Sequence, residues 1–538
     1  MLDPCWTPAG APLDPPRWSP AGATLGPRWT PAGPLRMTSP ARGLRPAHPA
    51  RPGMRGAHRT TFENARGIGS PMSSLDRFRR GCRLQGHSRS VPGPLPTKSA
   101  FWAPAELASG RITACATLGR HEGHADAWSG PAAADDLVRE SATMRLVFAD
   151  QTFSFELLRT LSYAAYGGAD IGECLVTASR IRDRDFESWH EEWSKTASRV
   201  HALADEALRQ RQRVSAREAY LRASNYYRTA EFFLHGDPDA SRLLATWGQS
   251  RTTFRQAVTL MDTPVEPVLI PYQGTGISSY LYRPDNSSAP RPTLLVHGGY
   301  DSTGEELYLY VAAAALQRGY NCLTFEGPGQ GALIREQRVP FRPDWETVVT
   351  PVVDYLLTRP EADPARLALR GISLGGYLAS RAAAFEHRVA ALIADDGLYT
   401  FHFSEKARAL TRVAALFGRR AAQYTLTKVM QRKSGIRWAI ENGMFTFQVN
   451  SIWDLIAATE SWSLEGVASK ITCPTLVCEA EGDHFFAGQP KMLYDALACP
   501  KTLMRFTADE GAEEHCHYGA LLLFNHRLFQ WLDMTLQR

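Results

Sequence analysis

One short segment restricts the folds open to this chain more than any other. An apolar run from Leu367 to Leu369 leads into Gly371-Ile-Ser-Leu-Gly375, and small residues typical of a helix follow. In this G-x-S-x-G pattern a strand turns sharply into a helix, the serine takes a strained backbone conformation, and the glycines avoid Cβ clashes. The pattern predicts Ser373 as an exposed nucleophile beside a helix N-terminus, which favours negative charge. A plain glycine-rich turn between a strand and a helix is the alternative.

The segments around this turn alternate between strand and helix patterns. Residues 265–270 and 277–282 predict an antiparallel pair around a turn. Further strands are expected at 293–297, 321–325, 367–369, 389–394, 475–478 and 502–506, and helices at 304–318, 344–357, 489–497 and 518–536. This order predicts the α/β class, with a mostly parallel sheet and helices on both faces. Together with the serine turn it predicts the α/β-hydrolase fold over 263–538, with a helical cap insert at about 397–469.

Residues 144–262 have the period of helices instead. Apolar residues recur every three or four positions, and no proline interrupts the stretch 188–236. Trp189 and Trp193 lie one helical turn apart and are expected in the core rather than in a ligand site. We therefore predict a helical N-terminal cap domain at 144–262.

Residues 1–143 differ in composition from the rest of the chain. They contain 19 of the 35 prolines and 18 Lys and Arg against 10 Asp and Glu, a net charge of +8 in a chain of net charge +5. Three copies of a Trp-Thr/Ser-Pro-Ala-Gly repeat are too short to bury a core, so this Pro-, Gly- and Arg-rich tail is predicted to be disordered. We expect the true start at Met144; a genuine disordered tail is the alternative.

A nucleophilic serine needs a base and a carboxylate that orients the base. On the predicted fold both follow the serine in the chain, each after a strand. Asp483 follows the strand at 475–478 and is our candidate acid, and His515 and His517 both qualify as the base. The alternative acids are Glu479, Glu481, Asp395 and Asp396. His297 and His484 are expected to line the site.

The oxyanion of a tetrahedral intermediate needs two backbone N–H donors. One is expected from Leu374, directly after the serine, and the other from Gly299 or Tyr300 in the glycine-containing loop after the strand at 293–297. The segment Glu326-Gly-Pro-Gly-Gln-Gly331 lacks the Lys-Ser/Thr of a phosphate loop, and its proline removes an N–H. It is expected to shape the rim of the pocket.

Five motifs occur in an order that resembles a known group of enzymes. They are His297-Gly-Gly-Tyr-Asp-Ser-Thr-Gly-Glu-Glu306, Glu326-Gly-Pro-Gly-Gln-Gly331, Gly371-Ile-Ser-Leu-Gly-Gly376, Glu481-Gly-Asp-His-Phe-Phe486 and Glu510-Gly-Ala-Glu-Glu-His-Cys516. They look like the α/β-hydrolases that include 2,6-dihydroxypseudooxynicotine hydrolase and the fungal polyketide-shortening pigment hydrolases, and more distantly the fermentation–respiration switch protein. The resemblance covers about 144–538.

This resemblance implies Ser373 as nucleophile, His515 as base and Asp483 as the orienting acid. It also implies cleavage of a carbon–carbon bond next to a ketone in an aromatic or polyketide-like small molecule. Trp453, Trp462, Phe401 and Tyr399 are available for such a substrate or for the core of the cap. A carboxylesterase, a thioesterase or an oligopeptidase-type serine peptidase is the alternative activity. A non-catalytic hydrolase-like binding protein is a third option.

The composition excludes several other classes. Residues 144–538 carry a net charge of −3, so nucleic acid is not an expected partner. The nine cysteines form no C-x-x-C pair, which argues against a disulfide framework or a zinc site. We predict no metal and no cofactor. No apolar stretch is long enough to span a membrane and no secretory signal is recognisable, so a cytoplasmic protein is expected. A homodimer is left open.

Overall fold

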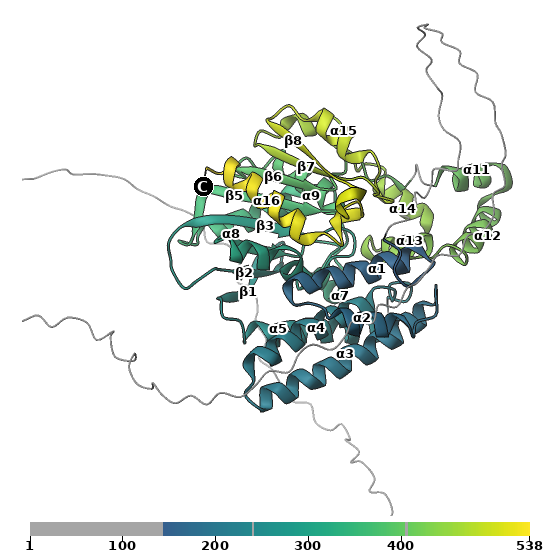
Figure 1. Cartoon of the computed structure of the whole chain (residues 1–538). Coiled ribbons are helices and arrows are strands. Elements are labelled where there is room, and N and C mark those ends of the chain that lie inside the picture. The colour runs from purple at the N-terminus through teal and green to yellow at the C-terminus, as the bar shows by residue number, and fades with distance from the viewer. Residues whose placement is uncertain (1–143, 239–240, 404–406, 538) are drawn as a thin grey trace, which may run out of the picture. The chain divides into compact units, whose positions relative to one another are not determined.

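The computed structural model describes residues 144–238, 241–403 and 407–537 (Figure 1). The predictions for residues 1–143 lie outside these residues. The described chain begins with five helices: α1 (Gln151–Ser162), α2 (Ile171–Ala178), α3 (Phe186–Arg209), α4 (Arg213–Glu231) and α5 (Ser241–Val258).

The long helix α3 shows why these residues are helical. Asp185 caps its N-terminus by accepting a hydrogen bond from the Ser188 N–H. Its apolar stripe includes Trp189 and Trp193, both fully buried as predicted. The Trp189 ring contacts Phe153 of α1 at a centroid distance of 4.9 Å, so aromatic packing joins α3 to α1.

An eight-stranded sheet follows, in the order β1-β2-β4-β3-β5-β6-β7-β8. Its strands are β1 (Val265–Tyr272), β2 (Thr275–Tyr282), β3 (Arg291–His297), β4 (Asn321–Phe325), β5 (Ala362–Ile372), β6 (Ala391–Asp395), β7 (Thr475–Ala480) and β8 (Lys501–Phe506). β1 and β2 pair antiparallel, β2 pairs antiparallel with β4, and the pairs from β4 to β8 are parallel. The loops after β3, β5, β6, β7 and β8 therefore meet at one edge of the sheet, where ligands of such sheets bind.

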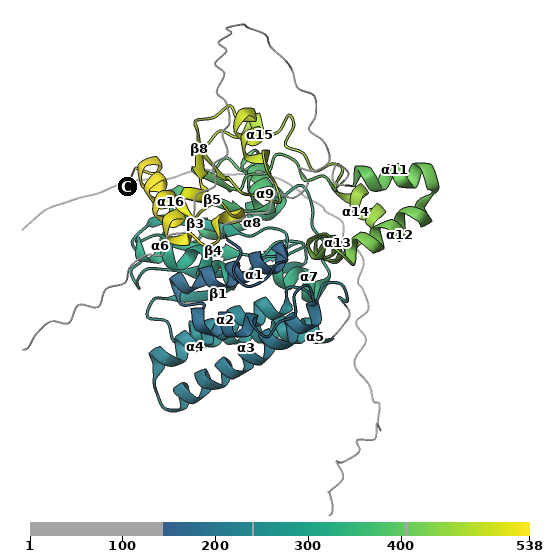
Figure 2. The same ribbon diagram turned by 45° about the vertical axis from the view of Figure 1, so that its right-hand side comes forward.

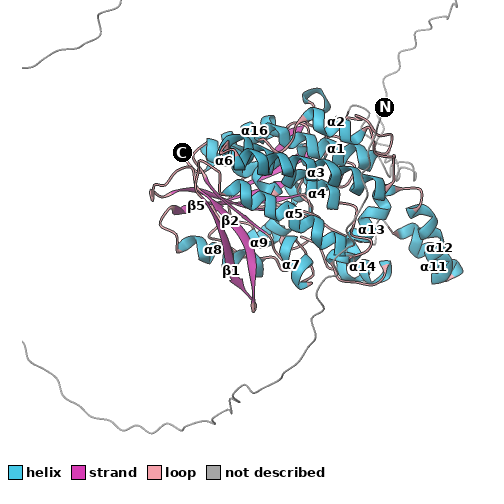
Figure 3. Cartoon of the chain, turned by 90° about the horizontal axis from the view of Figure 1, so that it is seen from below, coloured by secondary structure: helices cyan, strands magenta, loops and turns pink. Residues whose placement is uncertain are grey.

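Helices cover both faces of this sheet, as predicted. They are α6 (Ala313–Gln317), α7 (Gly331–Gln337), α8 (Glu346–Leu357), α9 (Leu374–Ala383), α15 (Gln489–Ala496) and α16 (Leu521–Thr535). Figure 3 shows α6 and α16 on one face and α8 and α9 on the other. The helix expected at 304–318 is shorter: a π-helical turn at Tyr308–Ala312 runs into α6.

A helical insert separates β6 from β7. It contains α11 (Arg408–Phe417), α12 (Arg419–Met430), α13 (Ser434–Thr446) and α14 (Ile452–Thr459). Figures 1 and 2 both place α11 and α12 away from the sheet. α13 lies against α1, where the Ser434 hydroxyl donates to the Asp150 carboxylate at 2.5 Å. Among the described residues, no helix has both the length and the apolar character of a membrane span.

Candidate active site

Ser373 sits at the turn from β5 into α9 in a strained conformation. Its φ of 61° and ψ of −125° are rare for a residue with a side chain. The neighbouring glycines permit this turn: a Cβ on Gly371 would lie 1.8 Å from the Gly375 carbonyl oxygen. The Ser373 N–H is held by the Asp395 carbonyl at 2.9 Å. Strain of this kind concentrates at functional sites.

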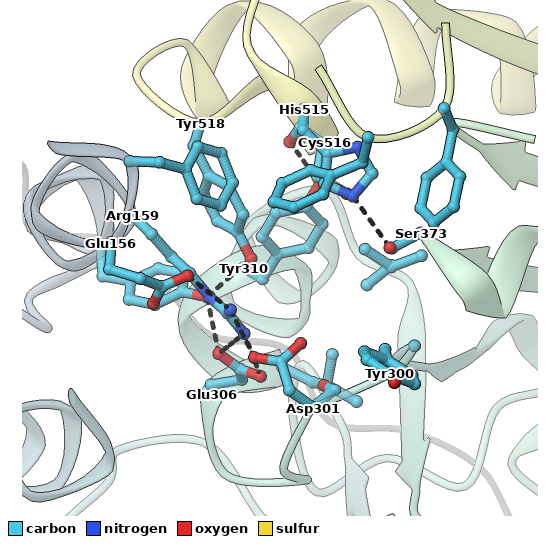
Figure 4. A pocket seen from close by; sticks show the side chains of 18 of the residues that line it. Glu156, Arg159, Tyr300, Asp301, Glu306, Tyr310, Ser373, His515, Cys516 and Tyr518 are labelled. Atoms are coloured by element: carbon cyan, nitrogen blue, oxygen red, sulfur yellow. Dashed lines mark hydrogen bonds and ion pairs between the residues drawn. The ribbon is translucent and has the colours of Figure 1, made fainter. Parts of the chain in front are cut away.

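The structure brings the three predicted catalytic side chains into one chain of contacts, of which Figure 4 shows the contact between Ser373 and His515. His515 Nε2 lies 2.9 Å from Ser373 Oγ, and His515 Nδ1 lies 3.0 Å from Asp483 Oδ2. The other oxygen of Asp483 accepts the N–H groups of Phe485 and Phe486. The serine, the histidine and the acid come from the loops after β5, β8 and β7. This is the geometry in which a histidine can take the serine proton.

A second carboxylate contacts the same histidine. Asp396 Oδ2 lies 2.9 Å from His515 Nδ1 and also accepts the Cys516 N–H. The other candidates lie elsewhere: Glu479 forms an ion pair with Arg505, and Glu481 accepts the Ala508 N–H.

The alternative base, His517, belongs to a buried network behind the site. Its Nε2 lies 3.2 Å from Asp395 Oδ1, and Arg370 Nη2 lies 2.5 Å from Asp395 Oδ2. The Tyr310 hydroxyl donates to Asp395 Oδ2 at 3.0 Å or to the Cys516 carbonyl at 2.7 Å. His517 therefore supports the loop that carries His515 and does not contact Ser373.

The charges of the acid and the base stabilise each other. Burial alone disfavours the charged form of Asp483, but the charge and hydrogen bond of His515 lower the pKa of Asp483 to about 2. Burial likewise opposes a charged His515, but the groups around it, first Asp483 and also Asp396, together raise the pKa of His515 well above its usual value. The acid is thus ionised at neutral pH and favours the protonated form of the base.

The loop after β3 packs directly on the serine turn. A Cβ on Gly299 would lie 2.6 Å from the Ile372 carbonyl oxygen and 2.9 Å from the Leu374 nitrogen. Only glycine lets the loop come this close. Leu374 is the first residue of α9, so its N–H has no acceptor within the helix. Both predicted oxyanion segments therefore lie beside Ser373, and the role of their N–H groups stays a prediction.

The Glu326–Gly331 segment has a different place from the one expected. It does not contribute to the rim of the cavity beside Ser373. Instead, Gln330 Nε2 donates to the carbonyls of Gly298 and Gly299 at 2.7 and 3.0 Å, and Glu326 accepts the Gly304 N–H at 2.6 Å. The segment thus lies behind the loop after β3 and fixes its position.

A small cavity of about 70 Å³ opens beside Ser373. Its apolar wall consists largely of Phe155, Trp438, Phe485 and Phe486. None of the four aromatic residues proposed from the sequence lines it; Phe401 and Trp462 pack instead in an aromatic cluster with Phe447. His297 and His484 do not line it either. His297 is buried against Phe325 and Trp345, and burial lowers its pKa to about 4.

Four residues that line the cavity, Glu156, Arg159, Asp301 and Glu306, form a charged cluster with Arg228. Arg159 of α1 donates to Asp301 at 2.7 Å and to both oxygens of Glu306 at 2.9 and 2.8 Å. Arg228 of α4 donates to Glu156 at 3.1 Å and to Asp301 at 2.9 Å. The sequence reading missed this cluster, although Asp301 and Glu306 belong to a quoted motif. The cluster ties the N-terminal helices to the loop after β3.

Two sets of buried side chains bring potential cation ligands within 4.8 Å of one another in the described part of the chain. They are Asp395, Cys478 and His517, and Asp396, His515 and Cys516. Burial raises the pKa of both cysteines well above its usual value, so both are thiols, which are poor ligands. The contacts described above pair Asp395 with His517, and Asp396 with His515 and the Cys516 N–H. The absence of a metal and a cofactor stays a prediction.

Comparison with known proteins places this chain in a family. A family model described as "Esterase FrsA-like" matches residues 180–417. The hydrolase LUC6 of a Fusarium species is 37% identical over 412 residues, which cover 73% of this chain and 98% of that protein. The 20-hydroxy-prefusarin hydrolase FUS2 of Gibberella moniliformis is 36% identical over 416 residues, which cover 73% of this chain and 98% of the FUS2 protein.

A solved structure agrees with the fold. The 2,6-dihydroxy-pseudo-oxynicotine hydrolase superposes with a TM-score of 0.56 at 20% identity, over 70% of this chain and 95% of that one. The predicted α/β-hydrolase fold and the predicted resemblance are both confirmed. The chain belongs to the α/β-hydrolase family that includes the hydrolases LUC6 and FUS2, and it is a hydrolase.

Proposed function

We propose that this hydrolase uses Ser373 to cleave a carbon–carbon bond next to a ketone in an aromatic or polyketide-like small molecule. The observation that carries the serine dependence is the position of His515, which contacts Ser373 Oγ at 2.9 Å and Asp483 at 3.0 Å. A relative supports the substrate class, because the FUS2 protein is by name a hydrolase of 20-hydroxy-prefusarin.

The reaction begins with the attack of Ser373 Oγ on the ketone carbonyl while His515 Nε2 takes the hydroxyl proton. The N–H of Leu374 and that of Gly299 or Tyr300 bind the resulting oxyanion. The carbon–carbon bond then breaks, and the leaving carbanion takes the proton back from His515. An adjacent aromatic ring or second carbonyl must delocalise this carbanion. Water finally attacks the acyl-enzyme with His515 as base, which releases a carboxylic acid and restores Ser373.

The cavity also constrains how a large substrate enters. A volume of about 70 Å³ is well below the 300 Å³ or more of typical pockets for such ligands. A bulky substrate therefore has to displace part of the apolar wall. Trp438 is on helix α13 of the insert, whereas Ser373 is on the sheet edge. We propose that movement of the insert, rather than of the sheet, opens the cavity.

Labelling with a fluorophosphonate tests the role of the serine. The protein is expected to be labelled, and Ser373→Ala is expected to lose the label while its thermal unfolding is unchanged. Equal labelling of Ser373→Ala would remove the serine from the mechanism.

Ester hydrolysis is a second candidate function, favoured by the match to a model described as an esterase family. Turnover of 1,3-diketones and acylated polyphenols should be compared with turnover of p-nitrophenyl esters. Cleavage of the ketones by the natural chain but not by Ser373→Ala supports the carbon–carbon reaction. Rapid ester turnover with no ketone cleavage across the panel supports the esterase.

A further inference from the structure

His515 is held between two carboxylates rather than one. Asp483 Oδ2 and Asp396 Oδ2 lie 3.0 and 2.9 Å from the same nitrogen, Nδ1. They come from different loops, since Asp483 follows β7 and Asp396 follows β6. Both residues are buried, so neither charge is screened by water.

Each carboxylate is also anchored by backbone donors of its own. Asp483 accepts the N–H groups of Phe485 and Phe486, and Asp396 accepts the N–H of Cys516. Asp396 has a left-handed φ of 51°, which aspartate tolerates better than most residues. The Cys516 bond links Asp396 to the residue after His515. Asp396 is therefore buried and bonded to the loop that carries the base, and is not a solvated neighbour.

We propose that Asp396 is a second positioning residue for His515. Asp396 and Asp483 together orient the imidazole of His515 and stabilise its charged form. This inference rests on the proposed role of Ser373 and His515. When the serine proton reaches His515 Nε2, the imidazolium faces two negative charges at Nδ1. A proton on Nδ1 is favoured by both carboxylates, so Nε2 is kept free to accept the proton even when one of them is absent.

If two carboxylates orient His515, the loss of one of them should lower the rate less than it does in a triad with a single acid. In a triad with one acid, its change to the amide lowers kcat by roughly 10⁴-fold, because the histidine takes the wrong tautomer. With Asp396 still in place, Asp483→Asn is expected to lose only about 10- to 100-fold. Asp396→Asn alone is expected to lose at most about tenfold, so the product of the two single effects is at most about 10³-fold. The double variant Asp396→Asn/Asp483→Asn is expected to lose roughly 10⁴-fold, which is more than this product.

The pH dependence separates positioning from a purely structural role. A carboxylate this close raises the pKa of the histidine, and its removal lowers that pKa by about one unit or more. Because His515 must be neutral to act as base, activity falls on acidification through this pKa. Asp396→Asn is therefore expected to move the acid limb of the pH–rate profile to lower pH. The amide retains an acceptor for the Cys516 N–H, which makes it the conservative choice.

The test is the second-order rate of fluorophosphonate labelling of the full chain from pH 5 to pH 9. It compares Asp483→Asn, Asp396→Asn and the double variant, with Asp495→Asn as a control for an exposed aspartate on α15. Three results together support the proposal. The labelling rate falls only partly in Asp483→Asn, it falls by more than the product of the single effects in the double variant, and the acid limb of the pH–rate profile shifts in Asp396→Asn. An Asp483→Asn rate as low as that of His515→Ala overturns it, and this comparison holds even if Asp396→Asn does not fold. An unchanged rate and acid limb in Asp396→Asn overturn it too.

Two further variants distinguish failure of this inference from failure of the proposed function. If Ser373→Ala or His515→Ala still reacts at the natural rate, the proposed function is wrong. If both are inactive and Asp396→Asn behaves like the unchanged protein, only the second positioning residue is wrong.

Discussion

The substitution Gly299→Ala tests the contact between the loop after β3 and the serine turn. The added methyl group would lie 2.6 Å from the Ile372 carbonyl oxygen, 2.9 Å from the Leu374 nitrogen and 3.1 Å from Ser373 Cβ. The first two are backbone atoms, so no side-chain rotation relieves the clash. Either the loop or the turn must move by a large part of an ångström.

Such a movement acts on rate more than on stability. Overpacking by one methyl group costs about 1–3 kcal/mol of folding free energy. A displaced loop also takes its N–H donor away from the oxyanion, and loss of one such donor lowers kcat by about 10²- to 10³-fold. We therefore expect a protein that is folded at 25 °C, has a lower Tm and has at most about one hundredth of the original kcat.

The assay is kcat on a p-nitrophenyl ester together with thermal unfolding. The matched control is Gly248→Ala on α5, where an added methyl group meets no atom within 4 Å. The control is expected to keep its kcat and gain about 0.5–1 kcal/mol of stability from higher helix propensity. A Gly299→Ala kcat within twofold of the original would refute the assigned role of this loop.

Three further predictions concern buried polar groups. Arg159→Met leaves buried carboxylates uncompensated and should lower the free energy of unfolding by about 3–5 kcal/mol; urea unfolding measures this, and the exposed Lys195→Met is the control that should stay unchanged. Burial lowers the pKa of His297 from 6.5 to about 4, so the unfolded chain takes up this proton first and stability falls as the pH drops from 6.5 to 4. This loss amounts to about 3 kcal/mol, and urea unfolding of His297→Gln at several pH values should show a flatter dependence; an unchanged slope contradicts the assignment. Tyr300→Phe removes the hydrogen bond of 2.7 Å to the Ala439 carbonyl and should cost about 1–3 kcal/mol while kcat stays near its original value, because the Tyr300 N–H remains; a large loss of kcat at unchanged Tm would contradict this.

The serine turn could be predicted because its determinants are local. Gly371, Ser373 and Gly375 lie within five residues, and the clash that excludes a Cβ at Gly371 is with Gly375 itself. The parallel sheet could be predicted from the alternation of strand and helix patterns. Because the acid must lie at the carboxyl edge of that sheet, its candidates were restricted to the ends of β6 and β7 and the loops that follow them. The sequence could not show that Asp396 and Asp483 both contact His515. The alternation of strands and helices predicts which loops lie at the sheet edge, but it does not predict the positions of side-chain atoms.

Contacts between segments that are far apart in the sequence could not be predicted from it. Arg159 and Asp301 are 142 positions apart, and no periodicity links them. The Glu326–Gly331 segment was expected at the rim for a similar reason. Its glycines indicated a tight loop, but the direction of the Gln330 side chain, which places the segment behind Gly298 and Gly299, depends on the folded loop after β3.

The charged cluster has a consequence for how members of this family can diverge. Arg159 and Arg228 belong to the N-terminal helices, whereas Asp301 and Glu306 belong to the loop that packs on Ser373. A chimaera that takes its helices from one relative and its sheet from another is expected to contain buried charges without a partner unless these positions match. The N-terminal helices and the sheet domain are therefore expected to change together during evolution, although each is encoded by its own contiguous stretch of chain.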